Sequence, residues 1–325
     1  MRIRGRRPIS WFSAIALAFT SLALAPSASS ETTLNVGKAQ ANADSIITVD
    51  VGAEHGFFQK HGLDLKILNF EGGSRIVQAL TAGSLDIAVG AGTQMSFVVK
   101  GAPMKAVCED TTTLPYFSVG VPYDSPIHSL DELKGKKIGV STPGSLTDWV
   151  AQELNRKKGW GPDGTMRVML GGGIAASTAG FRSHQIDAYI GGTTSFLAEE
   201  EKQAGRVLAP VSDFVGNIGS GTIFASNHLI ETNPDALRAF LLGWIETTNF
   251  ILTNKEATVK TWSKVTGFSP KIMSEEYDIV KGMFNPSCRF DEESLANLKR
   301  SFVELKLLDS EPDMSKLYTE AYLPK

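Results

Sequence analysis

The chain has 325 residues, of which 42% are hydrophobic and 21% are charged. This length accommodates about two globular domains with sizeable cores. The formal net charge of −3 and the sequence pI of about 6.0 exclude the strongly basic composition that is typical of proteins binding nucleic acid or anionic membranes.

The first thirty residues have the order of a secretory signal peptide. Four arginines fall within the first seven residues, an uncharged apolar run covers residues 11–25, and small residues precede Glu31. At about 15 residues, the run is shorter than the roughly 20 that a membrane-spanning helix needs. We therefore predict that residues 1–30 are a cleavable signal peptide.

The mature protein is expected to begin after Ala28 or Ser30. The Arg6-Arg7 pair leaves open whether export uses the general secretory or the twin-arginine route. No cysteine precedes Cys108, so a lipoprotein anchor is not available. Removing residues 1–30 with their four arginines leaves 295 residues, 28 basic and 35 acidic, and a net charge of −7. We expect a periplasmic protein with no stable membrane anchoring and no nucleic-acid partner.

Short apolar strands alternate with helical segments in the first part of the mature chain. The periodicity predicts strands at residues 34–37, 63–70, 85–89, 104–107 and 116–121. It predicts helices at residues 44–59, 74–82 and 94–100. Strands separated by helices favour a parallel sheet built from βαβ units.

A second series begins after Ser129-Leu130-Asp131-Glu132, which has the form of a helix capping box. Its predicted strands are residues 137–140, 166–170, 186–190 and 206–210, and a last strand at residues 222–225 follows this series. Its helices are expected to begin near Ser145, Ile174 and Thr194. The remaining sequence shows helical periodicity at residues 235–253, 255–266, 270–283 and 292–307.

The order of these elements predicts an α/β fold with two lobes, each containing a parallel or mixed sheet. Four consecutive helices without strands do not make a third such lobe, so we expect them to pack on the first lobe as a helical C-terminal extension. Lobe I is then residues 31–120 plus 220–325, and lobe II is residues 121–219. The two crossings, near residues 118–124 and 212–222, are expected to act as hinges.

Residues 83–93 and 184–194 nearly repeat one sequence. Each stretch follows an amphipathic helical segment, carries an aspartate (Asp86 or Asp187) at the start of a strand, and ends in a Gly-Thr loop. We interpret the two aspartates as structural turn groups. Loops at the carboxyl ends of parallel strands line the cleft between such lobes, so the repeat predicts two facing walls of one binding site.

Several segments also carry a family resemblance, in this order along the chain. They are residues 53–65 (AEHGFFQKHGLDL), 72–74 (GGS), 79–88 (ALTAGSLDIA) and 129–145 (SLDELKGKKIGVSTPGS). Together they resemble the extracytoplasmic solute-binding proteins of ABC importers, in the group for nitrate, sulfonates, taurine and thiamine precursors. The likeness covers roughly residues 34–225.

This resemblance implies the type II periplasmic-binding fold, a small-molecule ligand, and a membrane permease with its ATPase as partners. Sulfonate-binding relatives often carry Trp-Asp-Pro where this chain has residues 191–194 (GGTT). The ligand class therefore stays open among nitrate, an alkyl sulfonate, taurine, a thiamine-related pyrimidine and another small organic acid.

The candidate site consists of polar loop residues at predicted strand-to-helix junctions. Backbone N–H groups there are unpaired, and the helix dipole favours anions. Each hydroxyl alone fits an ordinary helix N-cap, whereas four such hydroxyls facing one cleft favour a ligand role. We expect a small, anionic solute. The predicted ligand-binding residues are Gln40, Asn42, Gly73, Ser74, Gly92, Thr93, Thr142, Ser145, Thr147, Gly192, Thr193 and Thr194.

An enzyme of the same fold, similar to pyrimidine synthases or menaquinone-pathway enzymes, is the alternative. The five histidines lack metal-binding spacing, and no Gly-x-Ser-x-Gly sequence is present. Residues 171–176 (GGGIAA) fit a dinucleotide-binding turn, but the following acidic residue, Asp187, starts the next strand and is misplaced for a ribose. We predict a binding protein with no catalytic residues, no cofactor and no metal.

The two cysteines, Cys108 and Cys288, permit two interpretations. An oxidising compartment is compatible with a disulfide between them. Two single cysteines far apart in a sequence are more often independent buried residues, and this unpaired state is the one favoured here.

Overall fold

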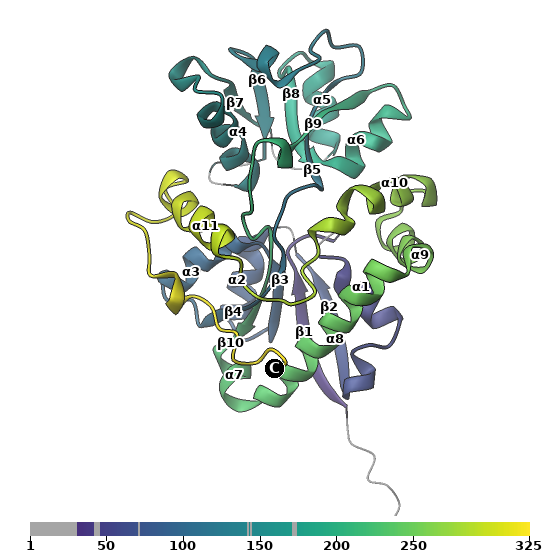
Figure 1. The fold of residues 1–325 in the computed structure, drawn as a ribbon, viewed down its shortest axis with the longest axis vertical. Helices are drawn as coiled ribbons and strands as arrows, with labels where there is room; N and C mark the ends of the chain where they lie inside the picture. The colour runs from purple at the N-terminus through teal and green to yellow at the C-terminus, as the bar shows by residue number, and fades with distance from the viewer. Residues whose placement is uncertain (1–30, 42–45, 71, 142, 144, 171–173) are drawn as a thin grey trace, which may run out of the picture. The chain divides into compact units, whose positions relative to one another are not determined.

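The structure is a computed structural model that describes residues 31–41, 46–70, 72–141, 143, 145–170 and 174–325. The predicted signal peptide, Asn42, Thr142 and the glycines at 171–173 lie outside the described residues. Within the described ranges the strands form two five-stranded mixed sheets, here named sheet A and sheet B (Figure 1).

Sheet A has the strand order β2-β1-β3-β10-β4. The strands β2, β1 and β3 run parallel, whereas β10 lies antiparallel between β3 and β4. Sheet A is therefore completed by a strand that follows all of sheet B in the chain. Its strands are β1 (Thr32–Lys38), β2 (Leu63–Asn69), β3 (Ile87–Gly90), β4 (Met104–Thr111) and β10 (Gly221–Ser226).

Sheet B has the order β7-β6-β8-β5-β9, with β5 antiparallel to both of its neighbours. The central strands β3 and β8 come from the repeated sequence, and each has the first strand of its own series beside it. The mixed sheets of the predicted fold class are confirmed. The strands are β5 (Phe117–Pro122), β6 (Lys137–Val140), β7 (Met166–Met169), β8 (Ala188–Gly192) and β9 (Gly205–Pro210).

The helices of the first part are α1 (Thr48–Glu54), α2 (Gly73–Thr81), α3 (Met95–Val99), α4 (Leu146–Lys157), α5 (Ile174–Arg182) and α6 (Thr193–Glu200). The prediction of a helix at residues 44–59 extends beyond the helix that the structure shows, α1. The described part of this range ends as α1 at Glu54, because Gly56 adopts φ +75° and turns the chain into a short 3₁₀ turn at Gln59–His61.

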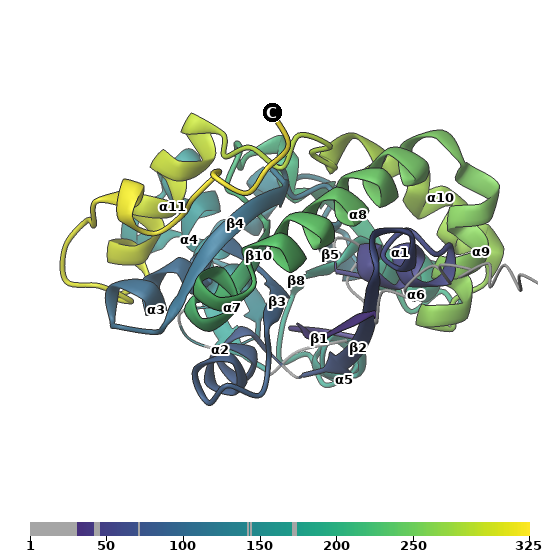
Figure 2. The ribbon, with the colours of Figure 1, turned by 90° about the horizontal axis from the view of Figure 1, so that it is seen from below.

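The C-terminal helices are α7 (Asn227–Thr232), α8 (Pro234–Thr253), α9 (Lys255–Thr266), α10 (Pro270–Val280) and α11 (Glu292–Glu304). The short α7 was not predicted. Helix α8 lies on one face of sheet A and α2 on the other (Figure 2). Leu237, Phe240 and Trp244 give α8 its buried stripe, and the Phe240 ring stacks on Phe58 at 5.1 Å. In the described ranges, no helix combines the length and the apolar character needed to cross a membrane.

The chain passes from sheet A to sheet B through residues 112–116 and returns through residues 211–220. The first crossing lies earlier than the predicted 118–124, because most of those residues belong to β5. The two crossings are joined at their sheet A ends. Ile218 N–H donates to the Thr112 carbonyl at 2.8 Å, and the hydroxyls of Thr111 and Ser220 lie 2.8 Å apart.

Cys108 and Cys288 form a disulfide, so the favoured unpaired state is wrong. The reason is tertiary. The segment after α10 returns to β4, where Glu109 N–H donates to the Cys288 carbonyl at 3.1 Å and Phe284 bridges to Thr111. This return brings together two cysteines that are separated by 180 positions in the sequence.

Candidate functional site

The described candidate residues gather at the carboxyl ends of the parallel strands in each sheet. In sheet A they follow β1, β2 and β3, and in sheet B they follow β6 and β8. Each sheet thus brings its own set to one edge. Gln40 and Ser74 are exposed, and Ser74 lies in the first turn of α2.

In sheet A the loop after β3 forms a 3₁₀ turn, η2 (Gly92–Gln94). The buried Gln94 side chain folds back, and its Oε1 accepts the Ala91 N–H at 2.8 Å. A Cβ atom at Gly73 would lie 1.8 Å from Gln94 Nε2, and one at Gly90 would lie 2.0 Å from Oε1. These two glycines therefore make room for Gln94. Sequence reasoning missed this amide, although it directly follows the Gly-Thr pair.

The same turn carries Gly92 and Thr93. Gly92 N–H donates to the Gly219 carbonyl at 3.1 Å, and a Cβ at Gly92 would lie 2.5 Å from Leu298 Cδ1 on α11. The Thr93 carbonyl accepts the Ser96 hydroxyl at 2.8 Å. Within the described ranges, no group hydrogen-bonds the half-buried Thr93 hydroxyl.

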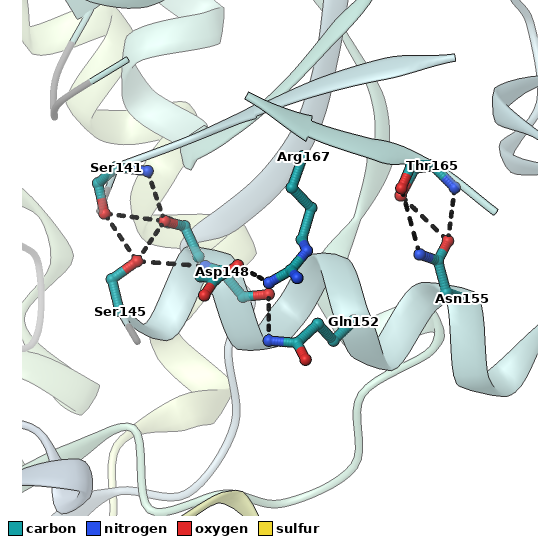
Figure 3. A network of polar contacts seen from close by, with 8 residues as sticks. Ser141, Ser145, Asp148, Gln152, Asn155, Thr165 and Arg167 are labelled. Carbon is teal, nitrogen blue, oxygen red and sulfur yellow. Dashed lines mark hydrogen bonds and ion pairs between the residues drawn. The ribbon is translucent and has the colours of Figure 1, made fainter. Parts of the chain in front are cut away.

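In sheet B, three hydroxyls form a triangle at the start of α4 (Figure 3). Ser141 Oγ lies 2.9 Å from both Ser145 Oγ and Thr147 Oγ1, and the latter two are 3.0 Å apart. Ser145 also accepts the Asp148 N–H at 3.2 Å as an N-cap, and Thr147 accepts the Ser141 N–H at 2.9 Å. Thr147 is buried, and its hydroxyl is bonded to Ser141, which was not among the predicted ligand residues.

Helix α4 is fastened to β7 by a second set of contacts (Figure 3). Arg167 on β7 forms an ion pair with Asp148, in the first turn of the helix. Near its other end, Asn155 Oδ1 accepts the Thr165 N–H at 2.8 Å. The hydroxyl triangle therefore lies at the N-terminus of a helix that is held near both ends against sheet B.

The loop after β8 places its two threonines differently. The Thr193 hydroxyl lies 2.8 Å from Ser118 Oγ and donates to the Pro115 carbonyl at 3.1 Å, so it ties α6 to the crossing segment. The Thr194 side chain, 7% exposed, has no hydrogen-bond partner among the described residues. Gly192 is the N-cap of α6. Among the described residues, the Thr194 hydroxyl is therefore unbonded, whereas the Thr193 hydroxyl is engaged.

A buried ion pair at the end of β1 was not predicted. Lys38 Nζ lies 2.6 Å from Asp50 Oδ2 and donates to the Ala41 carbonyl at 3.1 Å, and its side chain is only 2% exposed. Burial raises the pKa of Asp50, and the hydrogen bond and charge of Lys38 oppose that rise. In the sequence, the only indication of this ion pair is a lysine, Lys38, at the end of the apolar strand β1.

A cavity and a cluster of metal ligands are two other kinds of site, and in the described ranges neither involves these loops. A cavity of about 390 Å³ alongside α5 and the last residues of α6 is lined by Thr178, Arg182 and Glu199, among others, and by none of the predicted ligand residues. In the part of the chain that the structure describes, no three His, Cys, Asp or Glu side chains are grouped closely enough to hold a metal ion.

Comparison with known proteins gives relatives of two kinds. A binding protein of Brucella abortus is 30% identical over 217 residues, 66% of this chain and 66% of the relative. The THI5 4-amino-5-hydroxymethyl-2-methylpyrimidine phosphate synthase of Saccharomyces cerevisiae is 24% identical over 300 residues, 85% of this chain and 84% of the relative.

The fold has solved counterparts. The periplasmic aliphatic sulphonate binding protein SsuA of Escherichia coli superimposes with a TM-score of 0.74 over 88% of this chain and 92% of that protein, at 19% identity. The sequence profile described as NMT1/THI5 like matches residues 44–258, so the family-level resemblance found in the sequence is confirmed. The chain belongs to the NMT1/THI5-like family.

Proposed function

We propose that the mature chain is a periplasmic solute-binding protein that captures a small, anionic solute between the edge loops of sheets A and B. It delivers that solute to an ABC importer, whose permease and ATPase are its partners. One observation carries the proposal. The same polar loop follows the central strand of each of two sheets whose strands are arranged equivalently. In each copy one hydroxyl, that of Thr93 or Thr194, is not bonded by any described residue.

The ligand chemistry follows from the donors present. Hydroxyls and helix N-termini bind oxyanions without introducing a fixed positive charge. Ser145 caps α4, a helix of 12 residues, and Thr194 lies in the first turn of α6. The same proposal includes two lobes: lobe I is residues 31–120 plus 220–325, and lobe II is residues 121–219. We place the first hinge between them at residues 112–116.

A thermal-shift panel tests the ligand class. Nitrate, ethanesulfonate, taurine and 4-amino-5-hydroxymethyl-2-methylpyrimidine are each added to the mature protein. A solute at a hundred times its Kd stabilises a protein by about 2.7 kcal/mol, which raises the melting temperature by about 5 °C for a chain of this size. A melting temperature unmoved by all four compounds contradicts the proposed ligand classes.

An enzyme of the same fold is the second candidate, because the yeast relative carries a synthase name. The two functions differ in what leaves the protein. A solute-binding protein releases its ligand chemically unchanged, whereas an enzyme releases a product. Mass spectrometry of the stabilising compound after prolonged incubation and release distinguishes them: unchanged mass supports binding, and a converted compound supports the enzyme.

Export is tested by N-terminal sequencing of the protein recovered from the periplasm. The first residue is expected near Ser29 or Glu31. A full-length chain that stays in the cytoplasm contradicts the proposed location.

A further inference from the structure

Helix α11 contacts the η2 turn, which follows β3 of sheet A, and helix α4, which follows β6 of sheet B. On the side of sheet A, Leu298 is buried directly against Gly92 in the turn that carries Thr93. The helix is also anchored at its start, where Asp291 N–H donates to Glu109 Oε2 on β4 at 2.7 Å. Helix α11 is thus anchored to β4 and packed against the η2 turn.

On the side of sheet B, α11 contacts α4 through two side chains near its own end. Trp149 Nε1 donates to Glu304 Oε2 at 2.8 Å, and Arg300 Nη2 lies 3.4 Å from Glu153 Oε1. The Arg300 guanidinium also lies 6.0 Å from the centre of the Trp149 ring. Trp149 is 1% exposed and Glu153 is 3% exposed, whereas the Arg300 and Glu304 side chains are 31% and 32% exposed. Each contact therefore joins a buried group of α4 to a partly exposed group of α11.

The same face of α4 carries one of the predicted ligand hydroxyls. Ser145, Trp149 and Glu153 are four positions apart, and side chains at this spacing share one face of a helix. The α4 residues that contact α11 therefore lie on the same side of the helix as Ser145, a member of the hydroxyl triangle.

The charges at this contact are balanced. Burial raises the pKa of Glu153, but the Arg156 hydrogen bond and the Arg300 charge outweigh it, and the pKa is lowered overall. Glu153 therefore stays ionised. It keeps Arg156 as a partner when Arg300 is replaced, so loss of Arg300 does not leave an unpaired buried charge.

We propose that Arg300 and Glu304 are positioning residues for solute capture, which latch α4 to α11 and so set the spacing between the Ser145 and Thr93 loops. The consequence for binding rests on the proposed function, whereas the latch itself is tested without any solute. If these contacts were an ordinary ion pair between neighbouring helices, removing them would not change the arrangement of the two sheets.

The test is small-angle X-ray scattering of the ligand-free mature protein and its variants. Arg300→Met keeps the apolar stem and removes the charge, and Glu304→Ala removes the acceptor of Trp149. Losing a charge-assisted hydrogen bond is expected to shift the population toward a more open arrangement by roughly tenfold, which raises the radius of gyration. Glu304→Gln keeps an acceptor oxygen without the charge and is expected to restore part of the difference from wild type.

Arg238→Met on α8 is the matched control, since its partner Asp235 is exposed and both residues belong to the same helix. It should leave the scattering curve unchanged. A radius of gyration equal to wild type in both Arg300→Met and Glu304→Ala, with the variants folded by circular dichroism, overturns the latch. Because no solute is used, that result is independent of the ligand panel, and failure of the panel leaves the latch measurement standing.

Discussion

Asp86 and Asp187 occupy equivalent places in the two sheets. Asp86 Oδ2 accepts the Asn35 N–H of β1 at 2.8 Å, and Asp187 Oδ2 accepts the Lys137 N–H of β6 at 2.8 Å. Each aspartate also donates its own N–H to the carbonyl of that same partner, at 2.9 Å and 2.8 Å. The pair clamps the central strand of each sheet to its neighbour, which confirms the structural role inferred from the sequence repeat.

Asp187→Ala should therefore lower stability and leave solute affinity unchanged. Removing a charged acceptor from a backbone N–H is expected to reduce the free energy of unfolding by about 1.5 to 3 kcal/mol. Asp187→Asn keeps an acceptor oxygen and should recover part of this loss. Urea unfolding and calorimetric titration measure the two quantities, and a large affinity loss with unchanged stability speaks against the structural role.

Thr193 and Thr194 should respond differently to the same substitution. Thr193→Val leaves the buried Ser118 hydroxyl and the Pro115 carbonyl without their partner, and we expect a loss of about 1 to 3 kcal/mol in the free energy of unfolding. Thr194→Val removes no hydrogen bond between described residues and should cost less. Urea unfolding of both variants checks this order, and equal losses would show that the two hydroxyls are equally engaged.

Glu109 should make stability depend on pH. Burial raises the pKa of Glu109 from 4.5 to about 7, so the folded protein holds this proton more tightly than the unfolded chain. Its contribution is fully present below about pH 4.5 and is lost as the pH rises through about 7, a change of about 3 kcal/mol at most. Burial also raises the pKa of the neighbouring Asp110, which acts in the same direction.

Glu109→Gln tests this contribution. The variant should show a flatter fall in the free energy of unfolding between pH 4.5 and 7 than wild type, as measured by urea unfolding at several pH values. A wild-type pH profile in this variant would assign the dependence to other groups.

The disulfide should contribute substantially to stability. Cys108→Ser/Cys288→Ser is expected to reduce the free energy of unfolding by about 2 to 5 kcal/mol, because the bond links β4 to a segment 180 residues away. Thiol labelling of the native periplasmic protein should find no free cysteine. Two reactive thiols in that sample would contradict the pairing.

The sequence predicted most strands and helices and the repetition of the sheets, because these follow from local periodicity and from the Gly-Thr loops. It also predicted that the C-terminal helices add to the first sheet, since they contain no strand. The antiparallel placement of β10 and β5 has no local signal, because strand direction is decided by where the chain returns.

The site was harder to predict because side-chain direction depends on distant partners. Thr147 and Thr193 looked like ligand hydroxyls, yet their hydroxyls bond Ser141 and Ser118. Gln94 folds into space left by Gly73, which is 21 positions earlier in the chain. The Trp149–Glu304 contact spans 155 positions, and no sequence pattern relates those two residues.

Calorimetric titration of Thr93→Val and Thr194→Val with the solute that stabilises the mature protein tests the central claim most directly. A solute held by loops of both sheets should lose roughly ten- to a hundredfold in affinity in each variant, since a hydroxyl that bonds a charged group contributes about 1.5 to 3 kcal/mol. Asp187→Ala serves as the control that changes stability alone. Unchanged affinity in both threonine variants would contradict capture between the two sheets.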